Sequence, residues 1–124
     1  MKWTYDDSND SFAINVGKFT APRGIDVADI TEAVYMVKST KLDTDVSALA
    51  SLTLGSGLTI LEGATETDAQ IKVKFSSSDF GVGKLEIGNR YYAGFGIKTS
   101  TMTKFLEVKL VDDRLEIAQD FIHD

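Results

Sequence analysis

The sequence predicts an all-β protein, an antiparallel β-sandwich of about seven to eight short strands. Apolar residues alternate with polar ones along several short runs, as at Ile71, Val73 and Phe75, which lysines separate. Such alternation is typical of strands with one buried and one solvated face. Clusters of Gly, Ser, Thr and Asp recur roughly every ten residues, the spacing of turns in a sandwich. The chain has no cysteine, so its stability must come from a buried core and not from disulfides.

The length of 124 residues predicts one domain, residues 1–124, in which residues 1–10 form an N-terminal segment or arm. Hydrophobic residues make up 43% of the chain and charged residues 26%, as in an ordinary globular protein. The net charge is −6 and no basic run occurs, which argues against binding to nucleic acid or to anionic membranes. Residues 1–20 lack a segment of signal-peptide type, and no apolar run reaches membrane-spanning length. We therefore expect a soluble protein made in the cytoplasm.

The first 24 residues are predicted to hold one short strand. Residues 2–10 are polar apart from Trp3 and Tyr5, and we expect a turn at residues 6–10. Residues 11–16 alternate apolar with polar and predict a half-buried strand. Residues 17–24 contain the single proline and predict a loop.

The next segment, residues 25–38, is apolar on both faces. Its two faces carry Ala33, Tyr35 and Val37, and Val34 and Met36, respectively. Val, Ile, Thr and Tyr dominate its second half, which favours a strand. A helix is the competing interpretation, because the segment contains few helix breakers. As a strand, it would be covered on both sides or would use its second face as an interface.

The middle of the chain predicts short elements separated by turns. Residues 48–54 fit either a helical turn or a strand, because both periods match. A short strand is expected at residues 58–61, and the clearest one at 69–75, with Ile71, Val73 and Phe75 inward. The remaining segments are polar loops at 39–47 and 62–68, and a Ser/Gly-rich crossover at 76–88 with at most one turn of helix at 78–80.

Residues 89–117 organise the rest of the prediction. A first strand places Tyr91, Ala93, Phe95 and Ile97 on one face. After a polar break, a second strand is expected over 106–110, and a last strand carries Leu115 and Ile117. Two strands with one apolar face each are not stable alone in water, so the other strands must cover that face.

No motif indicates catalysis, a metal or a cofactor, so we expect a protein that is not an enzyme. His123 is the sole histidine and stands next to the last residue, where a catalytic base lacks the packing that orients it. Asp6, Asp7 and Asp10 resemble part of a calcium loop, but the Gly and Glu that such a loop needs are missing. Residues 81–84 fail the phosphate-loop pattern at both ends.

Several segments together carry a family resemblance. In chain order they are Phe12, Ile14 and Val16; Asp29–Ala33 leading into Val34–Lys38; Leu52–Ile60; Ile71–Phe75; Ser77–Phe80; Tyr91 and Tyr92; Leu115–Ile117; and Asp120–Ile122. This succession resembles a family of small immunoglobulin-like domains in tail and baseplate proteins of tailed bacteriophages. It is similar to the N-terminal domain of an upper baseplate protein, over most of residues 11–122. The chain departs from the family at Glu32, where the family has Gly, and in residues 98–104, which lack the usual Asp-Gly turn.

The resemblance implies an immunoglobulin-like sandwich that acts as a structural component of a phage or prophage tail or baseplate. Such a protein is made in the cytoplasm of the bacterial host and becomes part of the virion tail. Its partners would be other tail or baseplate proteins, or copies of itself in an oligomer. We expect the interface to include Trp3, Tyr5, Val34, Met36 and Tyr92, because aromatic residues are enriched at interfaces and an apolar second sheet face needs cover.

The alternative is a carbohydrate-binding module that recognises host cell-surface sugars. Aromatic side chains on a sandwich surface can stack on sugar rings, and weak glycan binding would use the same residues. A third possibility for the tyrosines is that they only stabilise the fold and bind neither a protein nor a sugar. In that case Tyr91 lies in the core and Tyr92 packs against a loop.

Overall fold

The computed structural model describes residues 2–6, 11–12, 15–22, 24–40, 48–61, 69–86 and 88–119. Within these ranges it describes the backbone alone for residues 2–6, 11–12, 15–17, 77, 118 and 119. The predictions for Ile14, residues 62–68 and His123 lie outside the described residues. No helix in the described ranges is long and apolar enough to cross a membrane.

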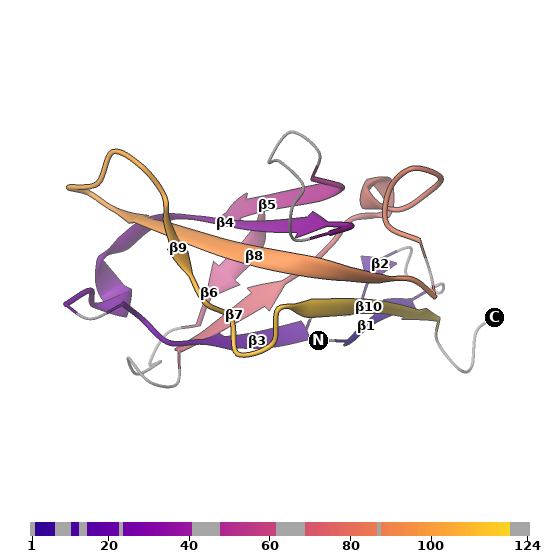
Figure 1. Ribbon diagram of the computed structural model, residues 1–124, viewed down its shortest axis with the longest axis horizontal. Coiled ribbons are helices and arrows are strands. Elements are labelled where there is room, and N and C mark those ends of the chain that lie inside the picture. The colour runs from indigo at the N-terminus through magenta and orange to yellow at the C-terminus, as the bar shows by residue number, and fades with distance from the viewer. Residues whose placement is uncertain are drawn as a thin grey trace.

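The described part of the chain is all-β, as predicted (Figure 1). Its strands are β1 (Lys2–Asp6), β2 (Ser11–Phe12), β3 (Asn15–Phe19), β4 (Ile30–Lys38), β5 (Ala50–Leu54), β6 (Gly57–Ile60), β7 (Ala69–Val73), β8 (Arg90–Thr99), β9 (Leu106–Val108) and β10 (Arg114–Gln119). Among the described residues, two segments form short 3-10 helices, η1 (Val27–Asp29) and η3 (Ser77–Asp79). The helical turn expected near residues 78–80 is therefore present. The helix alternatives for 25–38 and 48–54 are wrong over β4 and β5, and the predicted strand at 25–38 is wrong in its first part, because η1 holds Val27–Asp29 and β4 begins only at Ile30.

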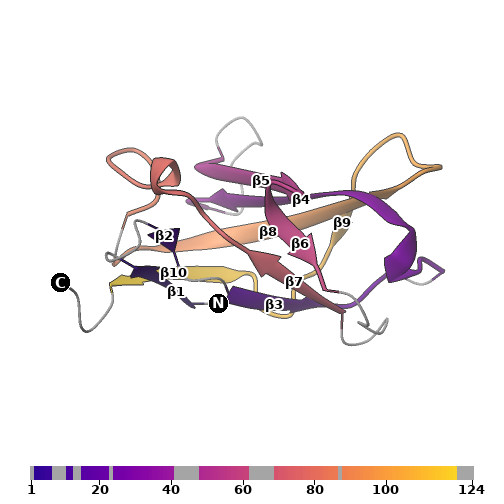
Figure 2. The ribbon, with the colours of Figure 1, turned by 180° about the vertical axis from the view of Figure 1, so that it is seen from behind.

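All strands belong to one mixed sheet that curls into a half-barrel (Figures 1 and 2). The strand order is β2-β1-β10-β8-β4-β5-β6-β7-β3, with β9 paired to β8. Most neighbours are antiparallel, but β1 pairs with β10 in parallel, and β5 pairs with β6 in parallel. The prediction of a wholly antiparallel arrangement is wrong at these two pairs. The first pair was missed because β1 and β10 come from opposite ends of the chain. The second was missed because only Gly55 and Ser56 separate β5 from β6, and so short a connection normally joins antiparallel strands.

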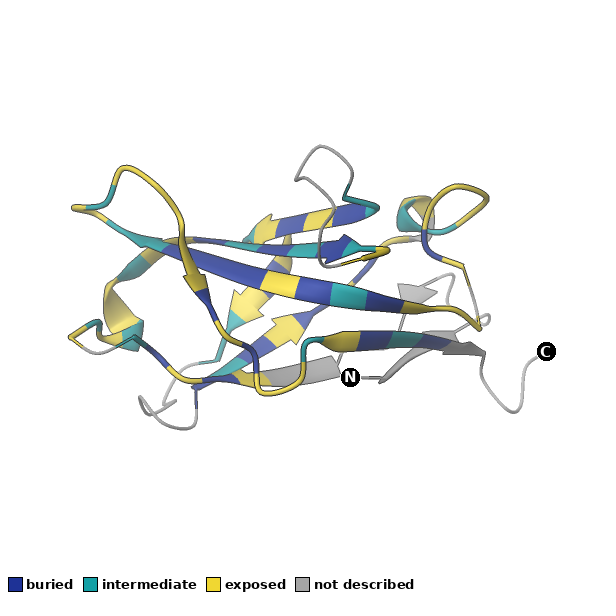
Figure 3. Ribbon diagram, in the orientation of Figure 1, coloured by how far each residue is buried: buried dark blue, intermediate teal, exposed yellow. Residues whose placement is uncertain are grey.

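Strand β8 is the centre of the sheet. One of its edges pairs with β4 over most of its length, and the other edge is shared by β10 and β9. Tyr91 is paired with Leu115 of β10, and Phe95 with Val108 of β9. In Figure 3, buried and exposed positions alternate along much of β8, with Tyr91, Ala93, Phe95 and Ile97 buried. This confirms the predicted inward face.

The two halves of the chain meet at Phe19. An isolated bridge pairs Phe19 of β3 with Leu110, and the Val111 N–H donates to the Lys18 carbonyl at 2.9 Å. Strand β3, the last in the strand order, is thereby tied to the segment that follows β9. The predicted loop at residues 17–24 is therefore wrong in its first part, because β3 extends to Phe19.

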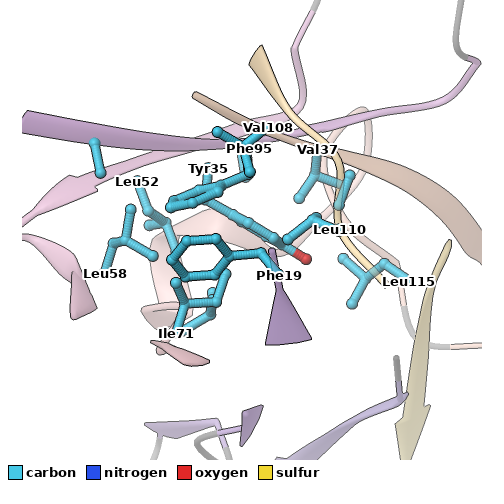
Figure 4. Packing of buried hydrophobic residues seen from close by; sticks show 14 of the residues in the cluster. Phe19, Tyr35, Val37, Leu52, Leu58, Ile71, Phe95, Val108, Leu110 and Leu115 are labelled. Atoms are coloured by element: carbon cyan, nitrogen blue, oxygen red, sulfur yellow. The ribbon is translucent and has the colours of Figure 1, made fainter. Parts of the chain in front are cut away.

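The core lies inside the curl, where side chains from both halves of the chain point toward one another (Figure 4). Its largest members include Phe19, Tyr35, Phe75 and Phe95, each at most 2% exposed. The rings of Phe19 and Phe95 have their centroids 4.9 Å apart. Burying one such side chain contributes roughly 1.5–3 kcal/mol, so the core stabilises the curled sheet without cross-links.

The N-terminal segment contains a strand that was not predicted, and residues 7–10 of the predicted turn lie outside the described residues. Strand β1 lies beside β10, with Trp3 opposite Ile117 and Tyr5 opposite Gln119. Trp3 and Tyr5 stand two apart between polar residues, which is itself a strand pattern. That signal was present in the sequence.

Candidate functional site

The outer face of the sheet carries a shallow apolar groove over β4 and β8. The outward residues of β4 include Val34 and Met36, which lie opposite Gly96 and Gly94 of β8. Because glycine has no side chain, β8 leaves a trough beside the two apolar side chains of β4. Phe95, Lys38, Phe105 and Glu107 complete the lining of this groove, whose volume is about 290 Å³. We call the eight lining residues the outer groove.

The two glycines differ in the space around them. A Cβ atom added at Gly94 would meet no atom within 4 Å, whereas one at Gly96 would lie 3.4 Å from both Phe105 Cβ and Val34 Cγ1. The groove is therefore widest over Gly94 and narrows at Gly96, between Val34 and Phe105. Glycine within a strand often marks a place where another backbone or a ligand comes close.

Phe105 forms the wall of the groove on the β9 side. Its side chain is 46% exposed, and the ammonium nitrogen of Lys98 lies 4.5 Å from the centre of its ring. The same nitrogen lies 3.8 Å from a carboxylate oxygen of Glu32. These contacts hold the aromatic ring at the edge of the sheet, so an apolar surface stays open to solvent beside charged groups.

A second depression lies where β8 meets β10, with a volume of about 800 Å³. Its lining combines the aromatic ring of Tyr92 with the charged side chains of Arg90, Asp112, Arg114 and Glu116. Across the two strands, Tyr92 is opposite Arg114 and Arg90 is opposite Glu116. The described part of this lining therefore carries two arginines and two carboxylates.

The structure brings two of the five predicted interface residues together in the outer groove and places a third beside it. Val34 and Met36 lie in the outer groove, and Tyr92 is two residues from Gly94 on the same face of β8. Trp3 and Tyr5 belong to β1 at the far side of β10, and only their backbone is described. The groove thus contains the apolar second face of β4, whereas Tyr92 lines the neighbouring depression.

Sequence reasoning missed six members of the groove: Lys38, Gly94, Phe95, Gly96, Phe105 and Glu107. A usable signal existed at the glycines, because they alternate with Ala93, Phe95 and Ile97 and so leave one face of β8 without side chains. No such signal marked Phe105, because its place at the groove depends on how the chain turns between β8 and β9.

Tyr91 lies in the core and is 6% exposed. This agrees with the prediction that it faces inward. Its hydroxyl oxygen accepts a hydrogen bond of 2.8 Å from the Glu86 amide. Tyr91 therefore anchors the 76–88 crossover to β8. The residue next to it, Tyr92, is half-buried and turned to the outer face.

Within the part of the chain that the structure describes, no three His, Cys, Asp or Glu side chains gather in a way that could hold a metal ion. Comparison with protein-family models, with curated proteins and with solved structures finds no match for this chain.

Proposed function

We propose that this protein is a non-enzymatic structural component that assembles with other protein molecules through the outer groove. One observation carries the proposal: the apolar outer face of β4, with Val34 and Met36 beside the glycine trough of β8. Solvent-exposed sheet faces are normally polar. An apolar groove with charged residues at its rim therefore has the residue composition of a protein interface.

The setting that we propose for this assembly is the tail or baseplate of a bacteriophage or prophage. The resemblance of residues 11–122 to immunoglobulin-like domains of such proteins supports this setting. The immunoglobulin-like sandwich remains part of the proposal. Partners are then other tail or baseplate proteins or further copies of this chain, and the protein, once made in the host cytoplasm, becomes part of the virion tail.

Mass spectrometry of purified tail particles from the source strain, after prophage induction, tests the proposal. We expect the protein at a fixed copy ratio to the other tail proteins. A strain with Met36→Glu should lose it from the particles, because a carboxylate in the groove opposes burial. Thr59→Glu is the matched control, since Thr59 is exposed on β6, away from the groove, and this variant should be retained. Tail-bearing particles that lack the wild-type protein would overturn the proposal.

A second candidate function is carbohydrate binding in the depression at Tyr92. Its lining joins an aromatic ring to several charged groups that can donate or accept hydrogen bonds, the combination that sugars require. Titration calorimetry with host cell-wall oligosaccharides is the test. Binding that Tyr92→Ala abolishes, while Met36→Glu leaves it intact, would favour this function over assembly.

A further inference from the structure

We infer that the outer groove binds a second copy of this chain, in a two-fold dimer centred on Gly94. This inference rests on the proposed function, because it names the partner for the same surface. The register of the strands, the placement of two opposite charges and the shape of the groove support it independently.

Gly94 lies midway between two opposite charges. The next outward residue of β8 in one direction is Gly96, which pairs with Glu107 on β9. The next outward residue in the other direction is Tyr92, which pairs with Lys38 on β4. Glu107 and Lys38 therefore lie on the strands at either side of β8, each shifted by two residues along the strand direction from Gly94, and in opposite directions.

A face-to-face dimer exchanges these two positions. Consider a two-fold axis that runs parallel to the sheet above Gly94, at right angles to the line from Lys38 to Glu107. This axis places Lys38 of one copy over Glu107 of the other, and Glu107 of the first copy over Lys38 of the second. Lys38 of each copy then faces Glu107 of its partner, so the same favourable contact forms twice. Such self-complementarity is the requirement for an isologous interface, and an unrelated partner would have no reason to match it.

The groove can accept such a partner at close range. No atom stands within 4 Å of the Cβ position at Gly94, so two backbones can approach there. The axis also places Met36 of each copy near the glycine trough of the other. Methionine suits this role because its unbranched, flexible side chain adapts to the space available.

Glu107 is available for such a contact. Its side chain is exposed and lines the groove, and it makes no hydrogen bond or ion pair with another side chain among the residues described. Lys38 lines the opposite end of the same groove. The charge pair would lie at the rim, where it sets orientation and partner choice more than affinity.

Sedimentation velocity of the purified full chain over a range of concentrations tests the inference. We expect a reversible dimer in the wild type. Lys38→Glu and Glu107→Lys should each weaken it about tenfold or more, because like charges then face each other twice. Mixing the two variants should restore the dimer, since every contact in the mixed pair joins opposite charges. The double variant Lys38→Glu/Glu107→Lys should dimerise like the wild type.

Two further variants separate shape from charge. Gly94→Trp should abolish the dimer by filling the trough, and Thr59→Trp, at an exposed position on β6, should not. Circular dichroism and the melting temperature show that each variant is folded.

A wild type that stays monomeric at about 0.5 mM would overturn the inference, as would single variants that fail to recover on mixing. If the wild type is monomeric but Met36→Glu still removes the protein from tail particles, the groove binds a different protein and the proposed function stands. If both tests fail, the proposed function fails as well.

Discussion

Two glycines at the turn between β5 and β6 have nearly the same φ angle and very different surroundings. Gly55 has φ +87° and Gly57 has φ +89°, in the left-handed region that favours glycine. A Cβ atom at Gly55 would meet nothing within 4 Å, whereas one at Gly57 would lie 2.8 Å from the Lys74 carbonyl oxygen. Glycine at this position permits the close approach of Lys74, just after β7, whose N–H donates to the Gly57 carbonyl at 2.8 Å.

This pair yields a matched prediction. Gly55→Ala should cost about 1–2 kcal/mol of unfolding free energy, because only the backbone conformation is strained. Gly57→Ala carries the same strain and adds a clash with backbone, so it should cost about 1–3 kcal/mol more. Urea denaturation of the two variants measures the difference. Equal losses would show that the approach of β7 does not limit the size of residue 57.

Phe19 connects the two halves of the core. It is fully buried and its ring packs on Phe95. Phe19→Ala should lower the unfolding free energy by about 3–5 kcal/mol, as expected for a buried aromatic residue. Val82→Ala is the control, because Val82 is 99% exposed, and it should change stability by less than about 0.5 kcal/mol. Thermal and urea unfolding both report the outcome, and a small loss at Phe19 would contradict its place in the core.

Phe19 also shows why part of the core could not be predicted. Alternation marks a strand only when each inward position carries an apolar side chain. In β3, the residue opposite buried Ile71 is Gly17, whereas Val16 is opposite exposed Lys72. The apolar residues of this strand therefore do not follow a single period, and Phe19 fell into the predicted loop. In β7 the pattern is complete, and Ile71, Val73 and Phe75 are fully buried as predicted.

At the scale of single elements, the short helix η3 is held by one carboxylate. A carboxylate oxygen of Asp79 accepts hydrogen bonds from the amide and the hydroxyl of Ser76, at 2.9 and 3.3 Å. The next residue, Phe80, packs edge-on against Phe75, with ring centroids 5.9 Å apart. The cap and the ring contact together fix the crossover between β7 and β8.

We expect Asp79→Ala to lower the unfolding free energy by about 1 kcal/mol, because two hydrogen bonds to Ser76 are lost. Asp79→Asn keeps an acceptor oxygen and should lose less than half of that. Hydrogen exchange of the Ser76 amide provides a local measurement, with faster exchange in the Ala variant. If the Ser76 amide exchanges as slowly in Asp79→Ala as in the wild type, the cap does not hold the turn.

The elements themselves were predictable to different degrees. β7, β8 and the second half of the segment that holds β4 were predicted as strands, because each has at least three buried apolar residues at every second position. The predicted strand at 25–38 began too early, since η1 precedes β4. β5 was ambiguous because Ala, Leu and Ser fit both periods. The neighbours of each strand were harder, since β1 and β10 pair across almost the entire chain. In the candidate site, Val34 and Met36 were predicted as interface residues. That Gly96 and Gly94 lie opposite them could not be predicted, because it depends on the pairing and register of β4 and β8.

At the scale of the whole molecule, the curl depends on the contact between β3 and the segment after β9. Val111→Pro removes the N–H that donates to the Lys18 carbonyl and should lower the unfolding free energy by about 1–3 kcal/mol. Val111→Ala keeps the N–H at this exposed position and should be nearly neutral. Urea denaturation compares the two variants. Equal stability would mean that the curled sheet does not need this hydrogen bond.

The central place of β8 also has a consequence for synthesis on the ribosome. β4 leaves the ribosome well before β8, because the chain between Lys38 and Arg90 must be made first. Until then, the β4 edge that β8 will cover offers unpaired backbone groups beside apolar side chains, a surface prone to aggregation. Nascent chains stalled before Arg90 should therefore be held by chaperones, and release should require the codons for β8 to be translated.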